Sequence, residues 1–69
     1  MCIQELIDQF TIQGMYCIKT YDNNMEECVI LEEGNDFEWE QCNIREDYLN
    51  SDIIYMYVED GVLNIEVEF

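Results

Sequence analysis

The sequence predicts one α+β domain that spans residues 1–69, built from a small antiparallel β-sheet with helices packed on one face. The first ten residues place apolar side chains at helical spacing, the following stretch alternates with period two, and an Asp-Gly pair divides two β-rich runs near the end. At 69 residues the chain holds a single core, and its apolar content of 49% is typical of globular domains. We therefore expect two hairpins plus a short strand, an N-terminal helix and a short second helix.

The N-terminal helix is predicted by apolar residues that recur at i, i+3, i+4 and i+7, namely Ile3, Leu6, Ile7 and Phe10. A helix of this length does not persist alone in water, so we expect its apolar stripe to pack on the sheet.

The first hairpin follows, where the period changes to two. A turn cluster at residues 22–24 separates a strand that begins near Thr11 from a returning strand over residues 28–33. If residues 23–24 form a two-residue loop, two facing pairs share the inner face: Ile18 with Val29, and Tyr16 with Leu31.

The middle of the chain predicts a short strand and a short helix. Residues 37–40 alternate aromatic and acidic side chains, with Glu38 and Glu40 expected to point outward. Asn43 and Glu46 are spaced as a capping box, which predicts one or two helical turns after Asn43.

The last hairpin is predicted by Asp60-Gly61, a pair suited to a type I′ turn. Its two-residue loop fixes a register that sets Val58 opposite Leu63, Met56 opposite Ile65 and Ile54 opposite Val67 on the inner face. The opposite face then carries Ile53, Tyr55, Tyr57, Glu59, Val62, Asn64, Glu66 and Glu68.

The charge of the chain excludes several classes of partner. Asp and Glu number 17 against 2 for Lys and Arg, which gives a net charge of −15, and Lys19 and Arg45 are the only cations. Nucleic acids and anionic membranes are bound through Lys and Arg, so neither is an expected ligand. Met1 leads directly into the amphipathic stretch without a secretion signal, and no apolar run approaches the roughly 18 residues of a membrane span. We therefore expect a cytoplasmic protein.

Catalysis, metals and cofactors are not expected. The chain has no His, the usual general base. Its 4 Cys residues form no C-x₂₋₄-C pair for zinc, and in a reducing cytosol we expect free thiols. The acidic turn cluster at residues 22–27 lacks the regular spacing of a calcium loop. An enzyme that works through cysteine or carboxylates remains an alternative, which single substitutions that abolish activity but not binding would reveal.

The arrangement of the acids suggests a binding surface. Alternate residues of a strand lie about 6.6 Å apart on one face, so Glu38 with Glu40 and Glu66 with Glu68 would form regular rows of anions that imitate a phosphate backbone. The alternative is a solvated face that keeps the protein soluble, for which a net charge of about 2 to 8 suffices in a small domain. Tyr55 and Tyr57 favour an interface, although cross-strand packing also explains them.

Two segments carry a resemblance: residues 3–14, which open with IQELID, and residues 55–63, YMYVEDGVL. They resemble segments of small acidic proteins of phages and mobile elements in low-GC Gram-positive bacteria. In kind, the chain is similar to the anti-CRISPR and anti-restriction proteins of such elements, several of which are acidic DNA mimics. The resemblance implies nuclease complexes of a bacterial host as partners, and it assigns no site residue.

The sequence therefore predicts an acidic anti-defence protein that binds and inhibits a nuclease complex by nucleic-acid mimicry. The alternative is a small protein-binding adaptor or homodimer without mimicry, whose binding would be less sensitive to salt. The expected partner-binding residues are Glu38, Glu40, Tyr55, Tyr57, Glu59, Asp60, Glu66 and Glu68.

Overall fold

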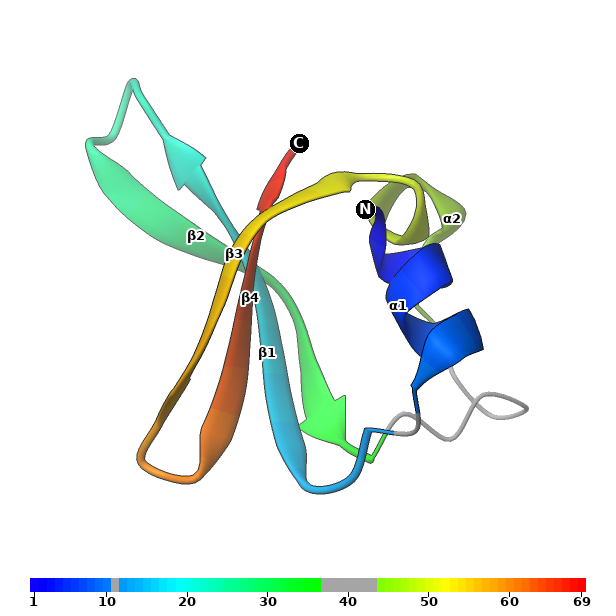
Figure 1. The fold of residues 1–69 in the computed structure, drawn as a ribbon. Helices are drawn as coiled ribbons and strands as arrows, with labels where there is room; N and C mark the ends of the chain where they lie inside the picture. The colour runs from blue at the N-terminus through cyan, green and yellow to red at the C-terminus, as the bar shows by residue number, and fades with distance from the viewer. Residues whose placement is uncertain (11, 37–43) are drawn as a thin grey trace.

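The computed structural model describes residues 1–10, 12–36 and 44–69, and it shows the predicted α+β architecture. Within these residues the elements follow in the order α1 (Ile3–Gln9), β1 (Met15–Asp22), β2 (Glu27–Asn35), α2 (Glu46–Leu49), β3 (Asp52–Glu59) and β4 (Val62–Glu68). Figure 1 shows both helices on one side of a twisted sheet. The strand predicted at residues 37–40 lies outside the described residues. No helix in the described ranges is long and apolar enough to cross a membrane.

The sheet is mixed, so the prediction of a wholly antiparallel sheet is wrong at its centre. The strand order is β2-β1-β4-β3. Each hairpin is antiparallel, but β1 and β4 pair in parallel, with Tyr16 opposite Leu63 and Ile18 opposite Ile65. This contact joins the two strands whose side chains are buried most completely. The hairpins therefore meet through their apolar strands and leave β2 and β3 at the edges.

The N-terminal helix is confirmed, and its first turn is capped locally. The backbone N–H of Cys2 donates a 3.2 Å hydrogen bond to Glu5 Oε1, and this bond lowers the pKa of the Glu5 carboxyl. Ile3 and Leu6 are buried against the sheet. Phe10 does not continue the stripe as predicted, because the helix ends at Gln9 and the extended backbone of Phe10 leaves its side chain exposed.

The predicted register of the first hairpin is wrong. Asp22 pairs with Glu27, so the turn holds four residues instead of two. The Asp22 carboxylate stabilises this longer turn by accepting the N–H groups of Asn24 at 2.8 Å and Met25 at 3.3 Å. A further irregularity between Ile18 and Lys19 displaces the pairing again.

As a result, the inner residues of β1 have other partners than those predicted. Ile18 lies opposite Glu32 instead of Val29, and Tyr16 lies opposite Gly34 instead of Leu31. The second helix begins at Glu46 after Arg45 as its N-cap, which is later than the predicted capping box implied.

The register of the last hairpin is confirmed from the turn to Met56, with Val58 opposite Leu63 and Met56 opposite Ile65. Beyond that point a bulge at Ile54 sets Ile53, not Ile54, opposite Val67.

The core lies between the helices and the two central strands. Ile3, Ile18, Ile65 and Val67 are fully buried, and the other buried members of the cluster are Leu6, Tyr16 and Ile44. Tyr48 of α2 packs on this cluster from the side and meets Phe69 edge to face at 5.1 Å between ring centroids. The helices thus cover β1 and β4 and do not bury the outer strand β3, which decides where a partner can reach the sheet.

Candidate protein-binding surface

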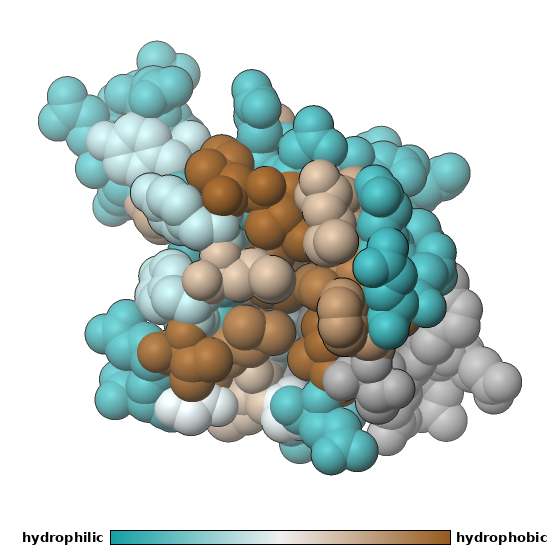
Figure 2. Space-filling model, viewed as in Figure 1, coloured by the Kyte–Doolittle hydropathy of each residue, from teal (hydrophilic) through white to brown (hydrophobic). Residues whose placement is uncertain are grey.

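The outer strand β3 exposes large side chains on both of its faces. On the side away from the helices, Tyr55 and Tyr57 are 59% and 40% exposed. On the helix side, Met56 and Val58 were predicted to be core residues, yet they are 43% and 71% exposed. Figure 2 shows hydrophobic side chains gathered across the middle of one face, bordered by hydrophilic ones. A contiguous apolar surface bordered by polar residues is typical of a protein–protein contact.

The exposed carboxylates of this hairpin lie at its two ends. Glu59 and Asp60 are exposed at the turn, and Glu68 is exposed at the far end, where it pairs with Asp52. Since β3 has 8 residues, its ends lie roughly 23 Å apart at about 3.3 Å per residue. Exposed aromatic and apolar side chains therefore lie between two acidic ends.

The predicted row of Glu66 and Glu68 is wrong, because Glu66 is only 8% exposed. Glu66 belongs to the central strand β4, where Lys19 of β1 and Tyr55 of β3 flank it. Its Oε1 lies 3.9 Å from Cys28 Sγ, within the range of a weak thiol hydrogen bond. The other predicted row, Glu38 and Glu40, lies outside the described residues.

Lys19, which the sequence interpretation did not select, occupies the middle of the uncovered face. Its Nζ donates to Tyr57 Oη at 3.3 Å and lies 5.6 Å from the centroid of the same ring. Partial burial opposes the charged form of Lys19, but the hydrogen bond to Tyr57 and the nearby Cys17, Tyr57 and Cys28 together outweigh it, so the pKa of Lys19 is raised. The sequence could have indicated this role, because Lys19 is a single cation within an otherwise largely apolar strand. Such a cation is expected to have a specific partner on the sheet face.

Cys17 lies beside Lys19 on this face and is almost completely buried. Burial raises the pKa of the Cys17 thiol, Lys19 opposes the shift, and Glu33 adds to it. Cys17, Cys2 and Cys28 are all free.

We expect the melting temperature to fall as the pH rises from about 8 to 11. The thiol pKa in the unfolded chain is about 8.5. Because folding raises the pKa of Cys17, the stability from the neutral thiol is fully present below that value and is lost as the pH rises through the folded value. Lys19 acts with the same sign at higher pH. Thermal melts of the protein and of Cys17→Ala would check this; an equally steep fall in both would contradict the role of Cys17.

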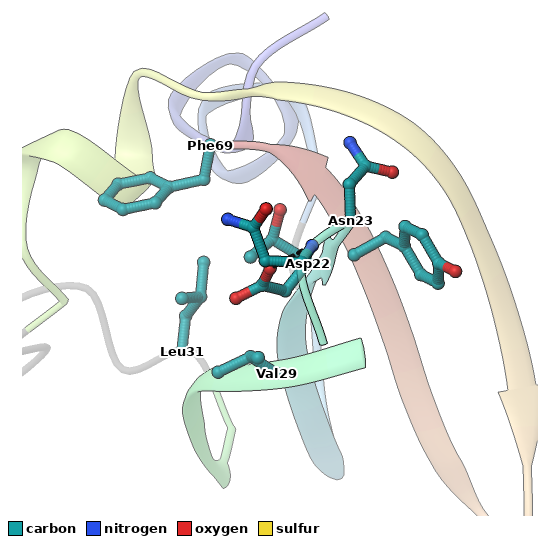
Figure 3. A pocket seen from close by; sticks show the side chains of 8 residues that line it. Asp22, Asn23, Val29, Leu31 and Phe69 are labelled. Atoms are coloured by element: carbon teal, nitrogen blue, oxygen red, sulfur yellow. Dashed lines mark hydrogen bonds between the residues drawn. The ribbon is translucent and has the colours of Figure 1, made fainter. Parts of the chain in front are cut away.

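A shallow hollow of about 440 Å³ opens beside the first hairpin. Figure 3 shows Phe69, Leu31 and Val29 around it, with Asp22 and Asn23 from the turn. The Asp22 carboxylate already accepts two backbone N–H groups of that turn. The hollow is therefore lined by polar residues of the turn as well as by apolar side chains near the chain end.

Within the described ranges, no three His, Cys, Asp or Glu side chains are grouped so that they could hold a metal ion. In the described part of the chain, the β3–β4 hairpin combines exposed aromatic and apolar side chains with carboxylates at both of its ends. Comparison with protein-family models, with curated proteins and with solved structures gave no match.

Proposed function

We propose that this protein is a non-catalytic inhibitor that binds a basic, nucleic-acid-binding protein and occupies its positively charged surface. One observation carries the proposal: the β3–β4 hairpin exposes aromatic and apolar side chains between two acidic ends, on a chain with a net charge of −15. A surface of this kind attracts a basic groove over long range and adds buried area on contact. A bacterial nuclease complex is the partner class that we propose.

The two cations do little to neutralise this surface. Lys19 lies against Tyr57, and Arg45 Nη2 lies 2.9 Å from Asp47 Oδ2 while its guanidinium stacks on Tyr48. The charge of Arg45 is thus paired with a carboxylate, whereas Lys19 keeps one positive charge between the two acidic ends. Among the described residues, no cation forms an ion pair with the carboxylates at the ends of β3, so they are available to a basic partner.

The proposed contact differs from a phosphate row. Since Glu66 is buried, the electrostatic contact would consist of the turn carboxylates Glu59 and Asp60 at one end and Asp52 with Glu68 at the other. Tyr55 and Tyr57 would contribute buried area between them, as aromatic anchors do in many interfaces.

The test compares two double variants that remove equal charge from the two hairpins. In Glu59→Gln with Asp60→Asn, the Asn-Gly pair keeps the type I′ turn. In Glu26→Gln with Glu27→Gln, the charges are lost from the opposite hairpin. After a partner has been captured from bacterial lysate and purified, we expect the first variant to bind it roughly 2- to 30-fold more weakly, from about 0.2–1 kcal/mol for each exposed ion pair. Its affinity should also depend less on salt.

Equal losses in both variants would contradict a specific role for this hairpin and leave only general charge attraction. A different function, an adaptor without mimicry, is favoured by the exposed apolar side chains of Met56 and Val58. Such an adaptor would keep its affinity in about 1 M salt, where the Debye length is only about 3 Å.

A further inference from the structure

The outer edge of β3 carries no charge and no Pro along its middle. β3 ends the strand order β2-β1-β4-β3, and no strand in the described residues lies beyond it. Edge strands are usually protected by charges, Pro or short length. β3 has 8 residues, and from Ile53 to Val58 it carries no charged residue and no Pro. The edge is therefore chemically suited to accept another strand.

The turn type determines which backbone groups of β3 point outward. Both turn residues, Asp60 and Gly61, have positive φ, 53° and 76°, and the residues that flank them pair with each other. Such a turn is closed by a hydrogen-bonded pair, and bonded and non-bonded pairs alternate along an antiparallel ladder. Met56 and Val58 belong to the non-bonded pairs, so their N–H and C=O groups are directed away from β4 toward the open edge.

The start of β3 already pairs with another segment of the chain. The N–H of Ile53 donates to the carbonyl oxygen of Met1 at 2.8 Å, and Cys2 forms an antiparallel bridge with Asp52. Residues 1–2 thus occupy the first part of the edge, and the bulge at Ile54 ends that part. Among the described residues the stretch from Tyr55 to Glu59 has no strand beside it, and the bridge between Cys2 and Asp52 shows that this edge already pairs in the antiparallel direction.

We propose that the open stretch Tyr55–Glu59 binds an extended segment of a basic protein as an added antiparallel strand. The partner's alternate side chains would be apolar on the side of Met56 and Val58, and cationic on the side of Tyr55 and Tyr57. The identity of the partner as a basic protein rests on the proposed function; the strand addition rests on the edge itself.

Charge complementarity favours this occupant over a second copy of the chain. A second copy would bring its own net charge of −15 to the contact. In an antiparallel self-pairing centred on Tyr57, the Glu59 of each copy would lie opposite an exposed tyrosine of the other instead of a cation. A basic segment instead places cations beside Glu59 and Asp60, which lie exposed at the end of the open stretch.

The test uses a peptide probe of seven residues that alternates Lys and Val, with blocked termini. In an antiparallel pair, directly opposite residues share a face, so the Val residues opposite Met56 and Val58 would direct their N–H groups at β3. A twin with N-methyl groups on its Val residues loses those donors, whereas a twin with N-methyl groups on its inner Lys residues keeps them. We expect the Val-methylated twin to bind at least about tenfold more weakly than the other two peptides.

Amide hydrogen exchange on the protein gives an independent measurement. We expect the amides of Met56 and Val58 to exchange quickly in the free protein and slowly with the unmethylated peptide. Val58→Pro, which removes an outward N–H, should abolish this binding, whereas Val58→Thr, which keeps it, should retain most of it. Circular dichroism of both variants would verify that they fold; the peptide twins do not depend on that result.

Each of the other outcomes contradicts a different part of the proposal. Equal binding of all three peptides with unprotected amides would exclude strand addition and leave the electrostatic function standing. Loss with the Lys-methylated twin alone would indicate parallel pairing. Protection of Met56 and Val58 without peptide, together with a dimer in sedimentation, would assign the edge to a second copy. No binding of any peptide, while the captured basic partner still binds, would place that partner elsewhere on the surface.

Discussion

Replacing Ile65 by alanine is expected to lower the free energy of unfolding by about 2–5 kcal/mol. Ile65 is fully buried on the central strand β4, between Ile18 of β1 and Met56 of β3. Helix α1 covers it, so the lost methyl groups leave a cavity that the two-layer core cannot easily close. At about 0.05–0.15 kcal/mol per residue, a chain of this length has roughly 3–10 kcal/mol in total. The variant should therefore melt at least about 8 °C lower.

Val58→Ala is the matched control, because it shortens an apolar side chain of the same sheet that is 71% exposed. We expect its free energy of unfolding to change by no more than about 0.5 kcal/mol. Urea unfolding of both variants would measure the difference. Equal losses would mean that β3 is covered in solution, either by a second copy or by another part of the chain.

The fold was predictable from the sequence where a local pattern is compatible with only one local structure. The spacing of Ile3 and Leu6 permits a helix with one buried face, and Asp60-Gly61 permits a single common hairpin turn, which fixed the register as far as Met56. The first hairpin has no such unique turn. Asp22 accepts two N–H groups and stabilises a four-residue loop, which the sequence alone does not distinguish from a two-residue loop at residues 23–24.

The contact between the two hairpins could not be predicted from any local pattern in the sequence. Parallel pairing of β1 with β4 depends on which strands bury the most apolar area together, and that choice involves the whole chain. The prediction of the candidate surface was incomplete for the same reason. Exposure of Tyr55 and Glu59 followed from alternation along one strand, but the burial of Glu66 and the exposure of Val58 depend on which strand is central and which is at the edge.

Gly34→Ala should destabilise the protein by about 1–3 kcal/mol, although alanine is normally the better residue within a strand. Gly34 lies on β2 opposite Tyr16, whose ring is buried in the core. A Cβ atom at Gly34 would lie 2.8 Å from Tyr16 Oη and 3.0 Å from Tyr16 Cζ. The ring cannot move away without leaving the core cluster, so the added methyl group displaces a core side chain.

The cause can be tested by repeating the substitution in a Tyr16→Leu background, with each free energy of unfolding measured in urea. Leucine has no atoms where the ring of Tyr16 meets Gly34, so there Gly34→Ala should be neutral or stabilising by about 0.5–1 kcal/mol. The same loss in both backgrounds would place the strain in the backbone of β2 instead of in the ring contact. Because β2 and β3 lie at opposite edges of the sheet, the folded fraction of Gly34→Ala should still bind the Lys-Val peptide with unchanged affinity. The variant would thus lower the stability of the sheet without changing peptide binding at the edge of β3.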